Sequence, residues 1–311
     1  AKTLRSIAVY PDKVSLETGA DSHTLVAMAT YKDDTTRDIT GDAVFRLAKP
    51  GIAELHGTQL KSSADGDTAV HVSFGGQEII VPVKVSDATK PRPVSFRLDV
   101  MPVFMRTGCN TGSCHGSARG QDGFMLSLFG YDPDGDHHRI TRQISTRRLN
   151  LALPSESLLV EKSVEAVPHT GGKRFDIDSP YYDTLVEWIK VGAPNDTKDV
   201  AKPVNIEILP PKLLLEGEGA TQQMTVIARY SNGTDRDVTP LVVFQSNNDN
   251  SATVSADGLV TAKNRGEAFV MARFATFTVG SQAVVIPEGL NYERPTLVAN
   301  NYIDDLVYDK L

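Results

Sequence analysis

The chain has 311 residues, of which 40% are hydrophobic, and it carries a formal net charge of −7. This length is sufficient for two or three domains, and the acidic balance argues against nucleic acid as a partner. No apolar run in the sequence reaches the length of a membrane span. The sequence starts without Met and without a signal peptide, so we expect a mature or excised fragment.

The first part of the chain, residues 1–88, has the pattern of short β-strands. Apolar segments at 6–11 and 24–31 are each short, and the first ends in a proline. Residues 68–74 alternate apolar and polar side chains, and residues 78–85 follow after Gly75-Gly76, which predicts a hairpin. Short strands at close intervals predict a β-sandwich.

The same pattern returns near the C-terminus at a constant offset of 199 residues. The residues that repeat include Tyr31, Thr35, Arg37, Asp38 and Thr40, which are answered by Tyr230, Thr234, Arg236, Asp237 and Thr239. An offset without interruption over this distance indicates one module used twice, at 1–88 and 201–289.

Each module resembles a bacterial Ig-like group 2 (BIG2) domain. The residues that carry the resemblance are the strand ending in Tyr31 or Tyr230, the R-D-[IV]-T tetrad, and the D-G-L-V-T turn at 257–261 of the second copy. The resemblance implies a small β-sandwich used for spacing, adhesion or docking, without chemistry of its own. Because the Arg-Asp pair occurs in both copies, we expect a structural ion pair there.

Both cysteines of the chain lie in the stretch 108–116, and a histidine follows the second one. Cys109, Cys114 and His115 form a C-x4-C-H motif, which resembles the C-x-x-C-H spacing of covalent haem attachment with two additional residues. The small residues between the cysteines favour a turn that accommodates the longer spacing. A Cys109–Cys114 disulfide, a zinc site and a catalytic thiol are the alternatives.

Residues 95–200 differ in character from both modules, and we expect helices at 155–162 and 179–191. This segment resembles the cytochrome c domain of large planctomycete proteins. The similar features are Cys114-His115, the 154–159 helix start, the 169–175 loop and the final helix at 185–194. The resemblance implies one covalent haem c held by Cys109 and Cys114, in a protein that is periplasmic or otherwise extracytoplasmic.

His115 is then the proximal iron ligand, because it directly follows Cys114. His169 is the best candidate for the distal ligand, since the loop that contains it precedes the last helix and no Met occurs between 126 and 223. Met125 is the runner-up, and an open sixth position is the third alternative. Arg148 and Arg174 are candidates for contacts to the haem propionates.

The predicted fold class is therefore multidomain: two all-β Ig-like sandwiches that flank a mainly α-helical cytochrome c-like domain at 95–200. Residues 290–311 are expected to be a linker and the start of a truncated further domain. The predicted function is electron transfer by a monohaem cytochrome module rather than an enzyme. Its partner would be a redox protein or a downstream domain of the same chain. Association with further copies of the chain into a homo-oligomer is a further alternative. Two alternatives are kept: a haem-based small-ligand sensor or peroxidase-like enzyme with an open sixth site, and a cell-envelope adhesion module with a Cys109–Cys114 disulfide.

Overall fold

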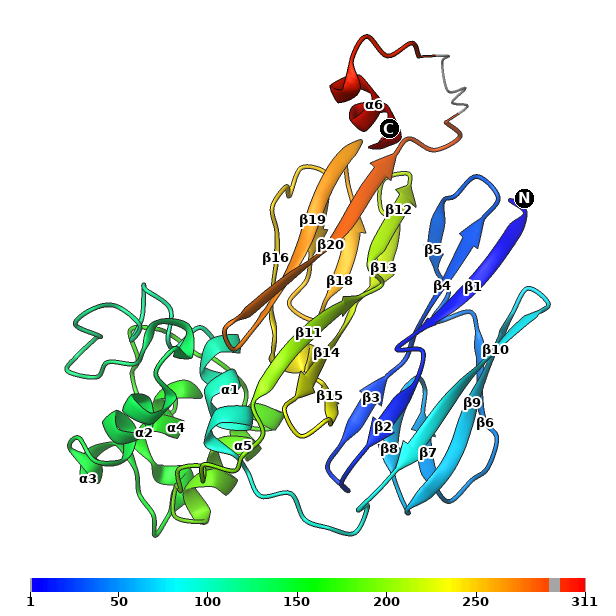
Figure 1. Ribbon diagram of the computed structural model, residues 1–311. Helices are drawn as coiled ribbons and strands as arrows, with labels where there is room; N and C mark the ends of the chain where they lie inside the picture. Colours follow the sequence, from blue (N-terminus) through cyan, green and yellow to red (C-terminus); the bar gives the residue numbers. More distant parts are fainter. Residues whose placement is uncertain (1, 291–296, 311) are drawn as a thin grey trace.

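β-Structure dominates the computed structural model, which describes residues 2–290 and 297–310 (Figure 1). Ten strands lie between residues 4 and 85, and ten more lie between residues 203 and 286. These strands form six sheets, three in each half of the chain. A segment of short helices and loops connects the two groups of strands.

The first module contains a hairpin that the sequence predicts, with Gly75 and Gly76 as its two-residue turn. Both glycines have positive φ angles, 56° and 81°, which a turn of this length requires and which glycine adopts without strain. The strands are β1 (Leu4–Tyr10), β2 (Val14–Leu16), β3 (Ser22–Thr24), β4 (Val26–Tyr31), β5 (Thr36–Asp38), β6 (Val44–Leu47), β7 (Ala53–His56), β8 (Gln59–Ser62), β9 (Gly66–Phe74) and β10 (Gln77–Val85). Their sheet orders are β1-β4-β5, β2-β10-β9-β6 and β3-β8-β7.

The second module repeats this topology strand for strand. Its strands are β11 (Pro203–Leu209), β12 (Lys212–Glu216), β13 (Thr221–Gln223), β14 (Thr225–Tyr230), β15 (Asp235–Asp237), β16 (Val243–Ser246), β17 (Ala252–Val254), β18 (Leu259–Ala262), β19 (Gly266–Phe274) and β20 (Phe277–Ile286). The sheet orders are β11-β14-β15, β12-β20-β19-β16 and β13-β18-β17, and β2 and β12 each pair in parallel with the last strand of their module. A short 3-10 helix, η4 (Thr239–Leu241), follows β15.

Alternation of side chains along the strands builds one hydrophobic core in each module. On β10, Val81, Val83 and Val85 are buried, while the residues between them are exposed. The β-branched side chains pack well on a pleated surface. Burial of each such side chain contributes about 1.5–3 kcal/mol to folding.

Two carboxylates join the modules to one another in a reciprocal manner. Asp38 Oδ2 accepts a hydrogen bond from the backbone nitrogen of Gln223 at 2.7 Å, and Asp237 Oδ2 accepts one from that of Thr24 at 2.9 Å. Asp38 and Asp237 correspond under the 199-residue offset, and so do Thr24 and Gln223. The two modules therefore meet through the same edge of each, as in a two-fold symmetric dimer.

The expected ion pair within each Arg-Asp repeat is wrong, because the arginines have other partners. Arg37 pairs with Asp42, and Arg236 pairs with Asp99 at 2.9 Å. The neighbouring aspartates are thereby free to accept the backbone N–H groups that connect the modules.

The segment between the modules consists of short helices around a small hydrophobic core. Its elements are the π-helix η1 (Phe96–Val100), α1 (Met101–Arg106), η2 (Leu128–Gly130), α2 (Pro133–Thr141), α3 (Ser145–Arg148), η3 (Pro154–Glu156), α4 (Leu158–Ser163) and α5 (Pro180–Lys190). The predicted last helix is confirmed as α5, which begins with a Ser179 cap and buries Leu185, Trp188 and Ile189. Phe96 and Phe104 pack into the same cluster.

The predicted fold class, with a mainly α-helical cytochrome c-like domain at its centre, is wrong. The six sheets make the chain a mainly β protein. The α-helices of the central segment have only 4 to 11 residues, and long stretches between them have no regular structure. The helical pattern at 179–191 correctly predicts one helix, α5. It does not show that the whole central segment is a helical domain.

A buried carboxylate fixes the central segment to the second module. Asp99 accepts a hydrogen bond from Ser95 N at 2.8 Å and pairs with Arg92 at 3.1 Å and with Arg236 at 2.9 Å. Burial alone would raise the pKa of the Asp99 carboxyl, but the charges of Arg236 and Arg92 outweigh it and hold this pKa below its ordinary value of 3.8. Asp99 is therefore ionised at neutral pH between two arginines.

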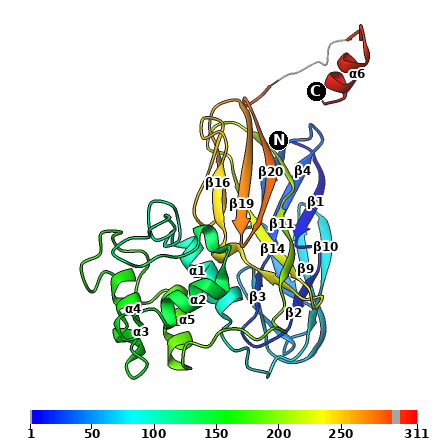
Figure 2. The ribbon, with the colours of Figure 1, turned by 60° about the vertical axis from the view of Figure 1, so that its left-hand side comes forward.

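The C-terminal helix α6 (Tyr302–Lys310) lies away from the sandwiches in both views (Figure 2). In the described part of the chain, no helix combines the length and the apolar character that crossing a membrane requires. The predicted start of a further domain at 290–311 lies partly outside the described residues. The domain boundaries at 1–88, 95–200 and 201–289 stay predictions.

We expect Asp99→Asn to lower the free energy of unfolding by about 3 kcal/mol, because it leaves the largely buried guanidinium of Arg236 without its ion-pair partner, whereas Arg92 keeps Asp21 at 3.7 Å. Since the folded pKa of Asp99 is depressed, its contribution to stability is present above the ordinary pKa of 3.8, and it is lost as the pH falls below 3.8 through the lower folded pKa. Urea unfolding of both proteins at several pH values measures this, and the difference between them should shrink in acid.

The matched control is Asp34→Asn, which removes the partner of Arg5 in an exposed ion pair. This change should cost less than about 1 kcal/mol, because water screens exposed ion pairs. Equal losses for Asp99→Asn and Asp34→Asn would show that the buried carboxylate does not hold the central segment.

Candidate functional site

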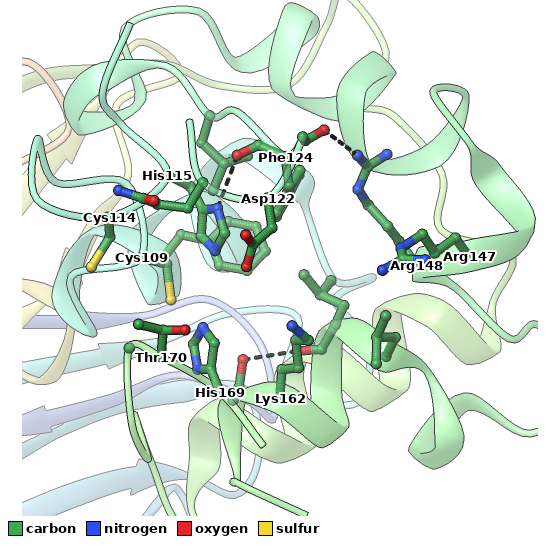
Figure 3. A pocket seen from close by; sticks show the side chains of 18 of the residues that line it. Cys109, Cys114, His115, Asp122, Phe124, Arg147, Arg148, Lys162, His169 and Thr170 are labelled. Atoms are coloured by element: carbon green, nitrogen blue, oxygen red, sulfur yellow. Dashed lines mark hydrogen bonds between the residues drawn. The ribbon is translucent and has the colours of Figure 1, made fainter. Parts of the chain in front are cut away.

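A cavity of about 520 Å³ lies in the central segment, and the residues singled out by the sequence gather around it (Figure 3). Cys109, Cys114, His115 and His169 all line it. Apolar side chains complete its wall, namely Phe104, Phe124, Leu126, Leu158 and Leu159. A cavity of this size with an apolar lining and a few polar groups is typical of a small-molecule or cofactor site.

The loop that contains the cysteines is fixed by backbone hydrogen bonds. Cys109 N donates to Phe104 O at 2.8 Å as the chain leaves α1, and His115 N donates to Cys109 O at 3.0 Å. Gly116 passes so close to the backbone of Asn110 that an added Cβ would lie 2.1 Å from its carbonyl oxygen. The four residues between the cysteines therefore fold into a compact turn that returns His115 to the side of Cys109.

Both thiols are free in the structure, so the disulfide alternative is not formed. Burial raises the pKa of the Cys109 thiol, and the contact between its sulfur and the Thr107 hydroxyl at 3.3 Å opposes this only in part. Cys109 is thus a protonated thiol at neutral pH. This state argues against the catalytic-thiol alternative, which needs a thiolate.

His115 is held by the backbone of the next loop. Its Nδ1 lies 2.9 Å from Phe124 O, and its ring packs against the Phe124 ring. A carbonyl oxygen only accepts hydrogen bonds, so Nδ1 carries the proton and Nε2 keeps its lone pair. Burial lowers the pKa of His115, which keeps this imidazole neutral.

His169 is oriented in the same way from the opposite wall. Its Nδ1 lies 3.0 Å from Gly172 O and donates to it, so the neutral form of the ring has its lone pair on Nε2. The turn is tight, since Gly172 N donates back to His169 O at 2.8 Å. An added Cβ on Gly171 would lie 2.9 Å from the His169 ring, so the loop needs glycine there.

The two imidazoles face one another across the cavity, with the sulfur of Cys109 beside the gap (Figure 3). Their ring centroids are 6.3 Å apart and their planes differ by 6°. Each ring offers a lone pair while its other nitrogen is held by a carbonyl, which is how proteins orient histidine ligands of a metal. Two opposed imidazole nitrogens suit a metal-containing cofactor that supplies the remaining metal ligands itself.

A bare metal ion does not fit this arrangement. Within residues 2–290 and 297–310, no group of three or more His, Cys, Asp or Glu side chains is placed to hold one. The zinc alternative needs four such ligands and therefore has no support in the structure.

The remaining candidates have other positions. Met125 does not line the cavity. The guanidinium of Arg148 donates to Arg139 O at 3.0 Å and to Gly123 O at 3.1 Å, and it stacks on the Phe124 ring. Arg174 lies behind the wall and donates to the carbonyls of Thr107 and Gly171.

Arg174 connects the two loops that carry the facing imidazoles. Thr107 precedes Cys109 by two residues, and Gly171 follows His169 by two, so one guanidinium holds both walls of the cavity. The sequence analysis did not find this role, because nothing in the pattern places residues 107 and 174 side by side. The cavity-lining Lys162 was also missed, since it is an ordinary lysine on a predicted helix.

Comparison with known proteins identifies the second module. Residues 204–285 match the family described as Bacterial Ig-like domain (group 2). The prediction of a BIG2 module is confirmed for this part of the chain. The first module has the same sheet orders.

Over 277 residues the chain is 22% identical to Ice-binding protein 1 of Shewanella frigidimarina (strain NCIMB 400). The match covers 87% of this chain and 27% of the relative, so the chain spans about a quarter of the relative's length. Domains 5–6 of the S-layer protein SbsC are 13% identical with a TM-score of 0.34, covering 92% of this chain and 99% of that one. A TM-score this low carries no argument about function.

The prediction of an electron-transfer cytochrome is wrong. The family match is to an Ig-like domain, and the curated relative is named for ice binding. The resemblance to a planctomycete-type cytochrome c domain has no support among these matches, whereas the alternative of a cell-envelope module agrees with them better. The error came from giving a two-cysteine motif more weight than the two modules around it.

We expect Arg174→Ala to lower the free energy of unfolding by about 1.5–3 kcal/mol, because it removes charged hydrogen bonds to the backbone carbonyls of Thr107 and Gly171. Hydrogen exchange should accelerate in residues 107–116 and 168–174 before it does in the sandwiches. Arg119→Ala changes an exposed arginine of the same segment and should stay within about 0.5 kcal/mol of the parent protein. Equal exchange rates in all three proteins would contradict the bridging role.

Proposed function

We propose that this chain is a cell-surface or cell-envelope module, located outside the cytoplasm, in which two Ig-like sandwiches form a rigid frame that presents the central segment. The observation that carries the proposal is the Ig-like match of the second module together with the same topology in the first. An Ig-like fold by itself implies no chemistry, and two such sandwiches in one chain suit a role in spacing and docking.

The junction between the sandwiches supports a frame rather than a flexible pair. The reciprocal Asp38 and Asp237 contacts, the Thr36 hydroxyl bonds to Leu214, and the Lys2–Glu216 ion pair all cross it. Modules joined only by a linker move relative to one another, whereas a connected interface restricts that motion. The central segment, fixed at Asp99, is then held at a constant position relative to both modules.

The location is tested on intact cells of the organism that encodes the chain. Antibodies against the purified protein should label unpermeabilised cells, and protease added outside should remove the signal. A cytosolic enzyme provides the control, since it should stay unlabelled and intact. Labelling that appears only after the cells are permeabilised would contradict a surface position.

We also propose one covalent haem c in the cavity, attached through Cys109 and Cys114 and bound axially by His115 and His169. The specific observation that favours it is the pair of opposed, parallel imidazoles 6.3 Å apart, each with its Nδ1 held by a carbonyl. This haem would be a bound group of the cavity, and no reaction is proposed for it.

The residues present fit this group. A bound haem would supply a redox-active iron together with the nitrogen donors of its own ring, and His115 and His169 would supply the protein ligands. Each thioether forms when a thiol S–H adds across a vinyl C=C bond: sulfur bonds to one carbon and hydrogen to the other, with nothing oxidised or released. The cysteines are free thiols beside the cavity, which this addition requires.

Expression in a host that matures c-type haem should give a coloured protein whose mass exceeds that of the polypeptide by one haem. The Cys109→Ser/Cys114→Ser double variant should lose the group in acid acetone. His169→Ala should convert a low-spin spectrum into a high-spin one, because the iron loses an axial nitrogen.

His138→Ala provides the control for this experiment, since His138 is an exposed histidine of the same segment and should leave the spectrum unchanged. A colourless protein with the mass of the bare polypeptide would eliminate the haem proposal. An unchanged spectrum in His169→Ala would remove His169 from the iron.

A further inference from the structure

We infer that Lys162 and Arg147 form a carboxylate-binding side of the cavity, which recognises the acidic groups of a porphyrin dicarboxylic acid. This inference rests on the haem proposal above and names the part of the bound group that these two side chains contact. Three observations support it. The cavity wall carries positive charge, Lys162 and Arg147 have no ion-pair partner among the described residues, and the neighbouring Arg148 already donates to backbone carbonyls.

The cavity wall is positively charged on one side. Arg147, Arg148 and Lys162 line it, while Asp122 is the one carboxylate among the lining residues. A group held there therefore meets excess positive charge, which favours an acidic ligand.

Lys162 lies in the cavity without a carboxylate of its own. It is on α4, one residue before Ser163, and its side chain points into the space beside His169 (Figure 3). No ion pair of Lys162 occurs within the described residues. By contrast, Lys173 and Lys190 of the same segment pair with Asp176 and Glu187.

Of the two adjacent arginines, Arg147 can bind a ligand, whereas Arg148 already donates its hydrogen bonds to the protein. Arg148 is buried, and its N–H groups are directed to the carbonyls of Arg139, Gln143 and Gly123. Arg147 is exposed at the mouth of the cavity, and the described residues provide it with no ion-pair partner. A guanidinium in this position can bind a carboxylate with two parallel hydrogen bonds.

The shape of the cavity indicates which acid is bound. At about 520 Å³, with an aromatic and aliphatic wall, it is much larger than a simple anion needs. The charged groups lie on one side, whereas the two imidazoles face one another across the middle. A flat apolar body with carboxylates at one edge matches both features, as in a porphyrin dicarboxylic acid.

The test uses the full chain made without haem maturation, so that binding is reversible. Iron protoporphyrin IX and its dimethyl ester are titrated into the protein, and absorbance reports binding. Wild type should bind the free acid about tenfold or more tightly than the ester, as expected for charge-assisted hydrogen bonds. Lys162→Gln and Arg147→Gln should each weaken binding of the free acid severalfold and leave that of the ester unchanged.

Two further variants separate charge from structure. Lys162→Arg keeps the positive charge and should retain most of the preference for the acid, while Lys173→Gln changes a lysine outside the cavity and should have no effect. Circular dichroism and urea unfolding of each variant show whether it is folded.

The outcomes distinguish this inference from the haem proposal. If wild type binds acid and ester equally with a low-spin bis-imidazole spectrum, the haem proposal stands and the carboxylate-binding side is refuted. The same conclusion follows if Lys162→Gln weakens binding of both ligands alike. If wild type binds neither porphyrin, the haem proposal and this inference fail together.

Discussion

The structure depends on three carboxylates that accept hydrogen bonds across the boundaries between its parts. Asp38 and Asp237 exchange backbone contacts between the sandwiches, and Asp99 holds the central segment against Arg236. Asp99 is buried, and a buried carboxylate without such partners would be costly, so it specifies one arrangement of its neighbours. Because Asp237 and Arg236 are adjacent, the contact between the modules and the contact to the central segment start from the same short strand, β15.

The cavity depends on a second, separate set of interactions. Its walls come from the loops at 108–116 and 169–172, which are far apart in sequence and are joined by Arg174. The imidazoles are placed by carbonyls of their own neighbourhoods, and the sulfur atoms by the turn that returns His115 to Cys109. The frame and the cavity thus use different residues. Loss of Arg174 disturbs the cavity without removing any contact between the sandwiches.

The sequence predicted what local pattern and repetition can encode. The glycine hairpin, the repeat and the last helix follow from periodicity and turn chemistry, and His169 was selected because it lies before that helix. The carboxylate contacts between modules could not be predicted, since nothing in a D-[IV]-T segment indicates that its partner is a backbone N–H 185 residues away. The roles of Arg174 and Arg148 were missed for the same reason: a guanidinium that binds carbonyls looks like any other arginine in the sequence.

The fold class failed for an instructive reason. A two-cysteine motif with an adjacent histidine and one amphipathic helix were enough to suggest a whole helical domain, although the strand residues of the two flanking modules outnumber the helical residues. The structure separates these signals. Strand alternation determines the architecture of the chain, whereas the motif determines only which side chains meet in one cavity. A site of this kind can be carried by short helices and loops, provided that a rigid frame holds both of its walls.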